Sequence, residues 1–273
     1  MLKVVYIDND LLESTSLPLI NSQIEIMPVN NVDNIFTGLD NTRFNIKEII
    51  YISNKLDLIL AAISKGICCI GYDNSSNLFN PKIKNIILDL SCISYMYLNT
   101  VLSHHNNEPA TIFNDKDILI RELSTNDFDS IYEMFNCETL DNTNYLSSYM
   151  TQDYNTEKDK FQKYILTQYE FYGYGQYIIF SNLHKEIIGQ CGFYEDNLGN
   201  IALSYYIKPK YRNMGLAYKS CSLLIEYATN ELFFEEIYAH INDTNLSSIN
   251  LITKLNFKKT DHCTYVLKIQ ETV

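Results

Sequence analysis

A β-strand, a short glycine-containing loop and an amphipathic helix follow one another directly in the C-terminal half of the chain. Residues 200–207 have the pattern of a strand, and the loop after it contains Gly215. Small and apolar side chains then recur every three or four residues, at Ala217, Cys221, Leu224, Ala228 and Leu232. This succession predicts a strand that leads through a tight loop into the N-terminus of a helix.

The start of this helix has the chemistry of an anion site. The first turn of a helix has unpaired backbone N–H groups and the positive end of the helix dipole, which together bind phosphate groups. Gly215 lets a phosphate approach the backbone closely, and Ala217 is small for the same reason. The segment therefore predicts a site for a pyrophosphate-bearing ligand.

Two motifs carry a resemblance to a known family. The pattern Arg212-x-x-Gly215-x-Ala217 after a strand resembles the acetyl-CoA pyrophosphate loop of the GNAT acetyltransferase superfamily. Residues 242–257 resemble the next helix in the branch with ribosomal-protein N-acetyltransferases, which runs Asn, two residues, Ser, then a helix ending in Lys-Leu-Gly-Phe. The resemblance spans about residues 118–270. It implies an α/β fold with a mixed, mainly antiparallel sheet flanked by helices.

The resemblance implies acetyl-CoA as a cosubstrate. Asn245 precedes the second helix and can cap it, and the resemblance adds a hydrogen bond from its side chain to the pantetheine arm. The pantetheine is expected to pair with the strand backbone at Tyr206 and Ile207. The implied cofactor-binding residues are Tyr206, Ile207, Arg212, Asn213, Met214, Gly215, Leu216, Ala217 and Asn245.

The catalytic groups are less clearly marked. Ser248 matches a Ser of the ribosomal-type branch and is the catalytic candidate, although a Ser in a first helical turn also serves as a cap. Many members of the family have a Tyr that acts as the general acid at the position of Ile252. In the family's Glu-x-Gly-Tyr motif, the Glu aligns with Ala202. The candidates to replace that base are Glu195, Asp196, Tyr205, Tyr206, His240 and Glu122.

Tyrosine is frequent, at 22 of 273 residues, and it is concentrated before the predicted strand 176–180. The cluster consists of Tyr169, Tyr172, Tyr174 and Tyr177. These rings could line an amine site through cation–π contacts. Because the chain has no Trp, we expect instead that most of them pack as large amphipathic side chains.

The first 110 residues predict a small Rossmann-like α/β domain. Short apolar runs typical of buried parallel strands are separated by helical spacing. The predicted strands are 4–7, 49–53, 67–72 and 86–88, and the helix between two of them ends at Lys65-Gly66. A polar segment closed by Pro109 follows, so we divide the chain into domains 1–110 and 111–273.

The N-terminal strand ends in Asp8-x-Asp10, which resembles the first motif of haloacid-dehalogenase-like (HAD) phosphatases. In a working enzyme of that family the first Asp attacks phosphorus, the second moves protons and Mg²⁺ holds the phosphate. Later, Ser53-Asn54 replaces the Gly-Asp pair and only Asp57 is retained. We interpret this half as a degenerate HAD-like domain that binds or docks.

Net charge and cysteine content limit the classes of binding partner and the cellular compartment that we expect. A net charge of −12 and a pI near 4.8 exclude a sequence-independent nucleic-acid binder and suit a small-molecule or peptide amine acceptor. Seven scattered cysteines, mostly in apolar runs and without a C-x-x-C pair, predict buried thiols, a reducing compartment and no metal site. No signal peptide or long apolar run is present, so we expect a cytoplasmic protein without membrane contact. The oligomeric state stays open.

The sequence leaves three functions open. The leading one is an N-acetyltransferase in which an amine attacks acetyl-CoA directly in a ternary complex. The second is a catalytically silent CoA-binding regulatory protein, because the usual Tyr and Glu are missing. The third is a bifunctional phosphohydrolase and acyltransferase.

Overall fold

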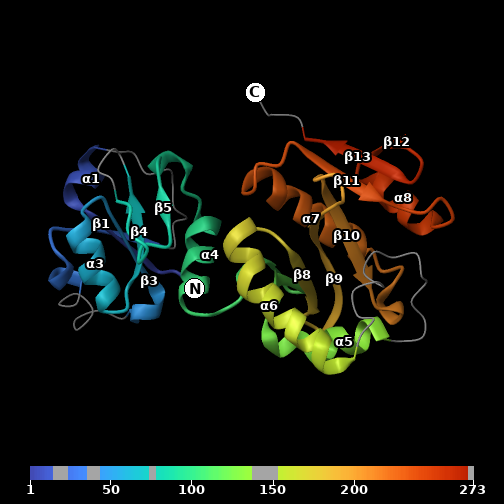
Figure 1. Cartoon of the computed structure of the whole chain (residues 1–273), viewed down its shortest axis with the longest axis horizontal. Helices are drawn as coiled ribbons and strands as arrows, with labels where there is room; N and C mark the ends of the chain where they lie inside the picture. Colours follow the sequence, from blue (N-terminus) through green and yellow to red (C-terminus); the bar gives the residue numbers. More distant parts are fainter. Residues whose placement is uncertain (15–23, 36–43, 74–77, 137–152, 270–273) are drawn as a thin grey trace. The chain divides into compact units, whose positions relative to one another are not determined.

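The computed structural model describes residues 1–14, 24–35, 44–73, 78–136 and 153–269 (Figure 1). The chain divides into two compact units, Met1–Ala110 and Thr111–Val273. Each unit has a sheet of its own and is described by itself.

The first unit is built on a five-stranded sheet in the order β2-β1-β3-β4-β5, with every neighbouring pair parallel. The strands are β1 (Val4–Asp8), β2 (Glu25–Val29), β3 (Ile49–Ser53), β4 (Cys68–Tyr72) and β5 (Ile86–Ile87). All residues of β1 and β3 are buried, because helices cover both faces of a parallel sheet. The sequence did not predict β2. It is a largely exposed edge strand that contains Pro28, so it lacks an apolar pattern.

Helices lie on both faces of this sheet. On one face, the side chains of Val5, Ile7 and Ile50 share a core with α4 (Tyr95–His105). On the other face, those of Val4, Tyr6 and Tyr51 share a core with α3 (Leu56–Ser64). The helix α1 (Asn9–Ser14) and two short 3-10 helices, η1 (Ile46–Glu48) and η2 (Leu90–Cys92), complete the unit. Gly66 follows α3 with a φ of 80°, as expected for a helix stop.

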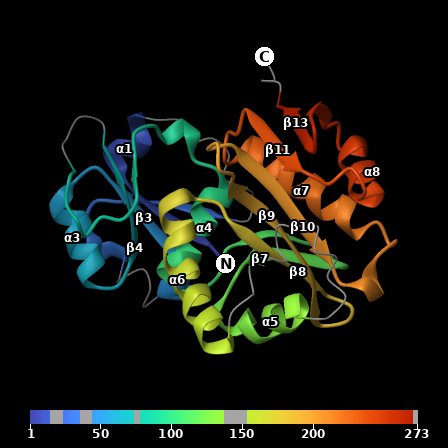
Figure 2. The ribbon, with the colours of Figure 1, turned by 45° about the vertical axis from the view of Figure 1, so that its right-hand side comes forward.

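The second unit contains an eight-stranded sheet in the order β12-β13-β11-β10-β9-β8-β7-β6 (Figure 2). Only the β10–β11 pair is parallel, so the sheet is mixed and mainly antiparallel, as the sequence predicted. The strands are β6 (Thr111–Asn114), β7 (Ile118–Glu122), β8 (Gln176–Ser181), β9 (Glu186–Glu195), β10 (Ile201–Ile207), β11 (Glu236–His240), β12 (Lys258–Asp261) and β13 (Thr264–Lys268). Strands β6, β12 and β13 were not predicted; β12 is fully exposed and so has no apolar pattern.

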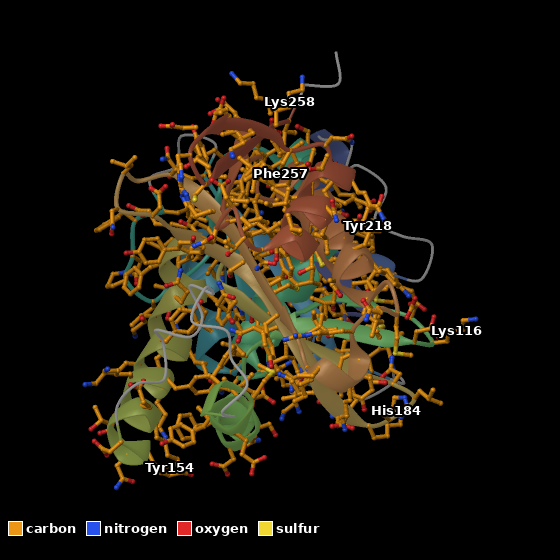
Figure 3. All side chains as sticks on the ribbon, turned by 90° about the vertical axis from the view of Figure 1, so that its right-hand side faces the viewer. Lys116, Tyr154, His184, Tyr218, Phe257 and Lys258 are labelled. Carbon is orange, nitrogen blue, oxygen red and sulfur yellow. The ribbon has the colours of Figure 1, made fainter. Side chains whose placement is uncertain are left out.

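Helices cover opposite faces of this sheet. Tyr205 and Tyr206 are consecutive on β10 and point to opposite sides. The ring of Tyr206 lies 5.5 Å from that of Phe135 on α5 (Phe128–Asn136), whereas Tyr205 lies close to Cys221 on α7 (Leu216–Asn230). The other helices are η3 (Thr125–Asp127), α6 (Tyr154–Tyr172), η5 (Pro209–Tyr211) and α8 (Leu246–Lys254). Tyr154 and Lys258 lie near opposite ends of this unit in Figure 3.

The parallel strands β10 and β11 separate soon after they meet. Their register contains one pair, Ala202 with Tyr238, although β10 continues to Ile207. On its other side, β10 stays paired with β9 along its whole length. The sheet therefore opens between β10 and β11, and the loop after β10 begins beside this gap.

The cysteines partly follow the prediction. Cys68, Cys69, Cys191 and Cys221 are buried free thiols, whereas Cys263 is partly exposed in the β12–β13 turn. Cys137 and the side chain of Cys92 lie outside the described residues. Among the described residues, no helix combines the length and apolar character needed to span a membrane.

Candidate functional site

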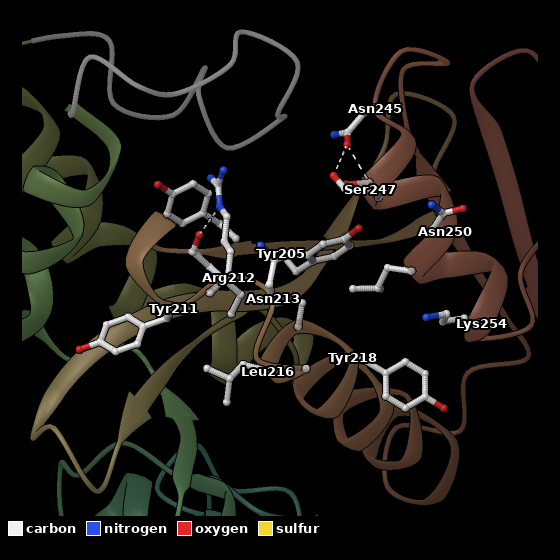
Figure 4. A pocket seen from close by; sticks show the side chains of 16 residues that line it. Tyr205, Tyr211, Arg212, Asn213, Leu216, Tyr218, Asn245, Ser247, Asn250 and Lys254 are labelled. Carbon is white, nitrogen blue, oxygen red and sulfur yellow. Dashed lines mark hydrogen bonds between the residues drawn. The ribbon is translucent and has the colours of Figure 1, made fainter.

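A pocket of about 370 Å³ lies where β10, the following loop, α7 and α8 meet. In Figure 4, Arg212, Asn213 and Leu216 lie on one side of it, Asn245, Asn250 and Lys254 on the other, and Tyr205 between them. The predicted residues in its wall are Tyr206, Ile207, Arg212, Asn213, Gly215, Leu216, Ala217, Asn245 and Ser248. Met214 was predicted too, but it is not part of the wall, because its side chain is 62% exposed on the loop.

The N-terminus of α7 opens into this pocket. Gly215 is its N-cap, with φ 76° and ψ 0°, and no side chain caps the helix. The backbone N–H of Lys219 bonds to the carbonyl of Gly215, which leaves the earlier N–H groups of the turn without a bond inside the helix. A Cβ at Gly215 would have no protein atom within 4 Å. The glycine is therefore needed for its left-handed φ, and the open space beside it belongs to the pocket.

The pocket wall carries positive charge in a chain of net charge −12. It includes Arg212 and Lys254 and no acidic side chain. The Nε of Arg212 donates to the carbonyl of Ile207 at 3.0 Å, and its guanidinium lies 5.5 Å from the ring centre of Tyr206. These two contacts hold the Arg212 side chain against β10, so the wall offers a cationic group and open backbone N–H groups to an anion.

The opposite wall is the first turn of α8. The Oδ1 of Asn245 accepts hydrogen bonds from the backbone N–H of Ser248 at 3.1 Å and from the hydroxyl of Ser247 at 2.9 Å (Figure 4). The sequence-based prediction that Asn245 caps this helix is confirmed. Because Oδ1 is occupied by the cap, the amide NH₂ group remains for a ligand.

We expect Asn245→Ala to affect both stability and ligand binding. Loss of the cap should lower the free energy of unfolding by about 1 kcal/mol. Loss of one neutral hydrogen bond should weaken acetyl-CoA binding about fivefold. Denaturant unfolding and calorimetric titration measure the two effects. Asp153 caps α6 and is absent from the pocket wall, so Asp153→Ala should cost similar stability and leave the dissociation constant unchanged. Equal binding by all three proteins would contradict this role of Asn245.

Tyr205 lies between the two walls of the pocket (Figure 4). Its hydroxyl is buried and forms no hydrogen bond of normal geometry with the described residues, although the side chain of Ser248 lies close to it. Burial raises the pKa of this phenol, and the side chain of Ser248 on α8 partly offsets the shift. Tyr205 thus stays protonated at neutral pH and faces Ser248 across the pocket. From the sequence, Tyr205 was a candidate base, and a phenol that keeps its proton at neutral pH is poorly suited to that role.

The two positions at which the GNAT resemblance places a catalytic Tyr and Glu hold residues that cannot transfer protons. Ile252 and Ala202 are fully buried apolar residues. Among the replacement candidates, Glu122 is buried at 4% exposure and lies outside the pocket wall, and Glu195 is exposed at the end of β9. The structure brings two further candidates together outside the pocket wall, because Nε2 of His240 lies 2.9 Å from Oδ2 of Asp196.

The tyrosine cluster before β8 belongs mostly to the core. Tyr169, Tyr174 and Tyr177 are buried, with ring contacts to one another or to Phe234, and only Tyr172 is largely exposed. None of the four is in the pocket wall. They pack the interior, and the structure gives no support to an amine site built from them.

In the first unit, both carboxylate oxygens of Asp8 are occupied. Asp8 is 1% exposed and accepts hydrogen bonds from the hydroxyls of Tyr51 at 2.6 Å and Ser53 at 2.7 Å. Asp10 pairs with Lys55 at 2.9 Å. A nucleophilic carboxylate needs a free oxygen within reach of phosphorus. The contacts of Asp8 are those of a structural carboxylate.

We therefore expect no Mg²⁺-dependent hydrolysis of p-nitrophenyl phosphate above the rate without protein. A colorimetric assay of the purified chain measures this directly. Asp8→Asn keeps the size of the side chain and removes its charge. Hydrolysis that this substitution abolishes would show that the first unit is a phosphohydrolase.

One group of potential metal ligands occurs in the described part of the chain. Single ligand atoms of Asp243, His262 and Cys263 lie within 4.8 Å of one another. The carboxylate of Asp243 is already paired with Lys259 at 2.7 Å. A neighbouring ammonium disfavours a cation, so the group is consistent with a surface ion-pair cluster.

The second unit thus combines an opened, mainly antiparallel sheet with an uncapped helix N-terminus and a pocket wall that carries positive charge. The sequence profile of the acetyltransferase (GNAT) domain matches residues 117–258. The match covers more than half of the chain, and the chain belongs to the GNAT acetyltransferase family. It is accordingly an N-acetyltransferase that uses acetyl-CoA, and the predicted GNAT resemblance is confirmed. The family match does not reach residues 1–110, and the HAD-like resemblance stays a prediction.

Solved structures with the same fold include two ribosomal-protein acetyltransferases. One is RimL, a ribosomal L7/L12 alpha-N-protein acetyltransferase in complex with coenzyme A, at 14% identity and a TM-score of 0.50, with 58% of this chain and 98% of that chain covered. The other is the ribosomal-protein-S5-alanine acetyltransferase from Vibrio fischeri, at 14% identity and a TM-score of 0.50, with 58% and 97% covered. No curated protein matches the sequence. At 14% sequence identity, the similarity to these two structures shows a shared fold only.

Proposed function

We propose that this chain transfers the acetyl group of acetyl-CoA to a primary amine by direct attack in a ternary complex. The observation that carries this proposal is the position of the pocket. It joins the open N-terminus of α7 to the last residues of β10, beyond the point where β10 pairs with β11, and to the first turn of α8. A pyrophosphate at α7 leaves the rest of the cofactor directed along β10 towards Tyr205 and Ser248.

The residues of this pocket suit the parts of acetyl-CoA. The backbone N–H groups of the α7 turn and the Arg212 guanidinium would hold the pyrophosphate. The backbone groups of the Tyr206–Ile207 stretch that are not paired with β9 would pair with the amides of pantetheine, and the Asn245 amide would donate to the same arm. The cofactor supplies an activated acetyl thioester, which an amine can attack.

The departing thiolate needs a proton. We propose that Tyr205 and Ser248 supply it as a pair, with Tyr205 as the donor and Ser248 as its polar neighbour. A phenol whose pKa is raised by burial is protonated over the whole neutral range. This arrangement would take over the role of the family's Tyr, whose place on α8 is filled by buried Ile252.

The acceptor is proposed only as a class, a primary amine on a small molecule or peptide. The net charge of −12 favours a cationic acceptor. RimL and the Vibrio fischeri enzyme are N-acetyltransferases of ribosomal proteins, so a protein N-terminus belongs among the first acceptors to test. The first unit is proposed to be an accessory domain that binds or docks.

The test has two stages. Calorimetric titration with acetyl-CoA should show binding, and the absence of binding would contradict the proposal. Thiol release from acetyl-CoA should then be followed with spermidine, kanamycin and peptides with free N-termini. The alternative is a CoA-binding regulatory protein without catalytic activity. It is favoured by Ala202 and Ile252, which replace the usual catalytic Glu and Tyr. Binding without thiol release above hydrolysis for every amine would support that alternative.

A further inference from the structure

Asp196 and His240 form a hydrogen-bonded carboxylate–imidazole dyad. His240 ends β11, and Asp196 lies in the turn between β9 and β10. The Nε2 of His240 lies 2.9 Å from Oδ2 of Asp196. The side chain of Asp196 is 9% exposed, whereas that of His240 is 35% exposed. The carboxylate is thus a buried anchor, and the imidazole remains accessible.

Hydrogen bonds within its own turn fix the side chain of Asp196, in addition to the bond with His240. Its Oδ1 accepts hydrogen bonds from the backbone N–H groups of Leu198 and Asn200, and its Oδ2 accepts one from the side chain of Asn200. Burial alone would raise the pKa of Asp196, but the hydrogen bonds from Asn200 and His240 lower it to about 2. The group is therefore an ionised, rigid acceptor at neutral pH.

The ionised carboxylate determines the tautomer of His240. A carboxylate without a proton can only accept, so Nε2 must carry a hydrogen. In the neutral ring the lone pair then resides on Nδ1. Asp196 is the only hydrogen-bond partner of His240 in the described part of the chain, which leaves Nδ1 available to a substrate.

The register of the strands shows on which face of the sheet His240 lies. Ala202 and Tyr238 are parallel partners, so their side chains point to the same face. Two residues further along each strand, Ser204 and His240 point to this face too. Tyr205 and Ser248 lie on the opposite face, with α7. The dyad and the Tyr205–Ser248 pair therefore lie on opposite sides of the place where β10 and β11 separate.

From this geometry we infer that His240, positioned by Asp196, is the general base that takes the proton of the attacking amine. The inference rests on the proposed acetyl transfer. The amine nitrogen forms a bond to the acetyl carbon, and its proton passes to Nδ1 of His240. The carbon–sulfur bond breaks, and the thiolate leaves towards the other face, where it takes a proton. His240 lies on β11 two residues beyond Tyr238, the parallel partner of Ala202, and Ala202 is the position on β10 that lacks the family's Glu.

The neighbours of the dyad come from β11 and β13. His240 is paired with Thr264 on β13. Tyr238, two residues before His240 on β11, donates to Glu236, and the negative charge of Asp196 contributes to its raised pKa. Among the described residues, Asp196 is the one carboxylate that contacts the ring of His240.

Kinetics of three variants test the inference with the best acceptor from the amine panel. His240→Gln can still donate to Asp196 but has no basic nitrogen, and kcat/KM should fall about 100-fold. The decrease of kcat/KM at low pH that the wild type shows should be absent from the pH profile of His240→Gln. Free imidazole should restore part of the activity of His240→Ala. Asp196→Asn should give a smaller loss and a shifted acid limb. Acetyl-CoA binding should be unchanged in all three variants.

His105 is the matched control. Its Nε2 also has a single contact, to the carbonyl of Gly66 at 3.1 Å in the first unit, so His105→Gln should behave as wild type. Long-range ¹H–¹⁵N spectra of the imidazole rings, with His240→Gln to assign the signal, should show the Nε2–H tautomer. An Nδ1–H tautomer would overturn the inference even if no acceptor is found. An active wild type with an unchanged His240→Gln profile would overturn it and leave the proposed function intact.

Discussion

Gly215→Val is expected to abolish measurable binding of acetyl-CoA, with a dissociation constant raised about 100-fold or more. A side chain here would project into open pocket space beside the first turn of α7, where the pyrophosphate is proposed to lie. It would displace two or more charge-assisted hydrogen bonds, each worth about 1.5–3 kcal/mol. Calorimetric titration of wild type and variant measures the change.

The chain contains a matched control for backbone strain. Gly173, the C-cap of α6, has φ 71° and ψ −3°, and a Cβ added there would also have no atom within 4 Å. Gly173→Val should therefore cost about the same stability, roughly 1–2 kcal/mol for a left-handed residue, and should bind acetyl-CoA as wild type does. If both variants bind equally well, the α7 N-terminus is not the pyrophosphate site.

Tyr205→Phe is expected to lower kcat about 100-fold while acetyl-CoA binding changes less than threefold. General acid catalysis contributes about 10²–10⁴ in rate, and the substitution removes only the hydroxyl. Ser248→Ala should give a smaller loss, because its hydroxyl supports Tyr205. The double variant should be little slower than Tyr205→Phe, since both groups serve one proton transfer. Thiol release under saturating acetyl-CoA measures each rate.

Tyr177→Phe is the matched control for Tyr205→Phe, because it also removes a buried tyrosine hydroxyl. It lies on β8 of the same sheet, is fully buried, and its hydroxyl also lacks a hydrogen-bond partner among the described residues. Because it is absent from the pocket wall, Tyr177→Phe should retain the wild-type kcat. A wild-type kcat in Tyr205→Phe would assign the proton of the thiolate to another group or to water.

Local sequence was sufficient for the elements that build the cofactor pocket. The positive φ of Gly215, the cap at Asn245 and the left-handed Asn256 after α8 follow from short-range sterics and hydrogen bonding. The buried parallel strands β1 and β3 were visible as continuous apolar runs. Strands β2 and β12 were not visible, because mostly exposed edge strands have no apolar pattern to detect.

The sequence by itself determined the family, the strand–loop–helix that is proposed to bind acetyl-CoA, and the absence of the usual Glu and Tyr at Ala202 and Ile252. It could not choose among the candidate bases, because Asp196 and His240 are 44 residues apart and meet only through the pairing of β9, β10 and β11. The tertiary structure also decided that Tyr205 faces Ser248 and that Asp8 is enclosed by hydroxyls. Such contacts depend on strand register and side-chain burial, which arise from the packing of distant segments.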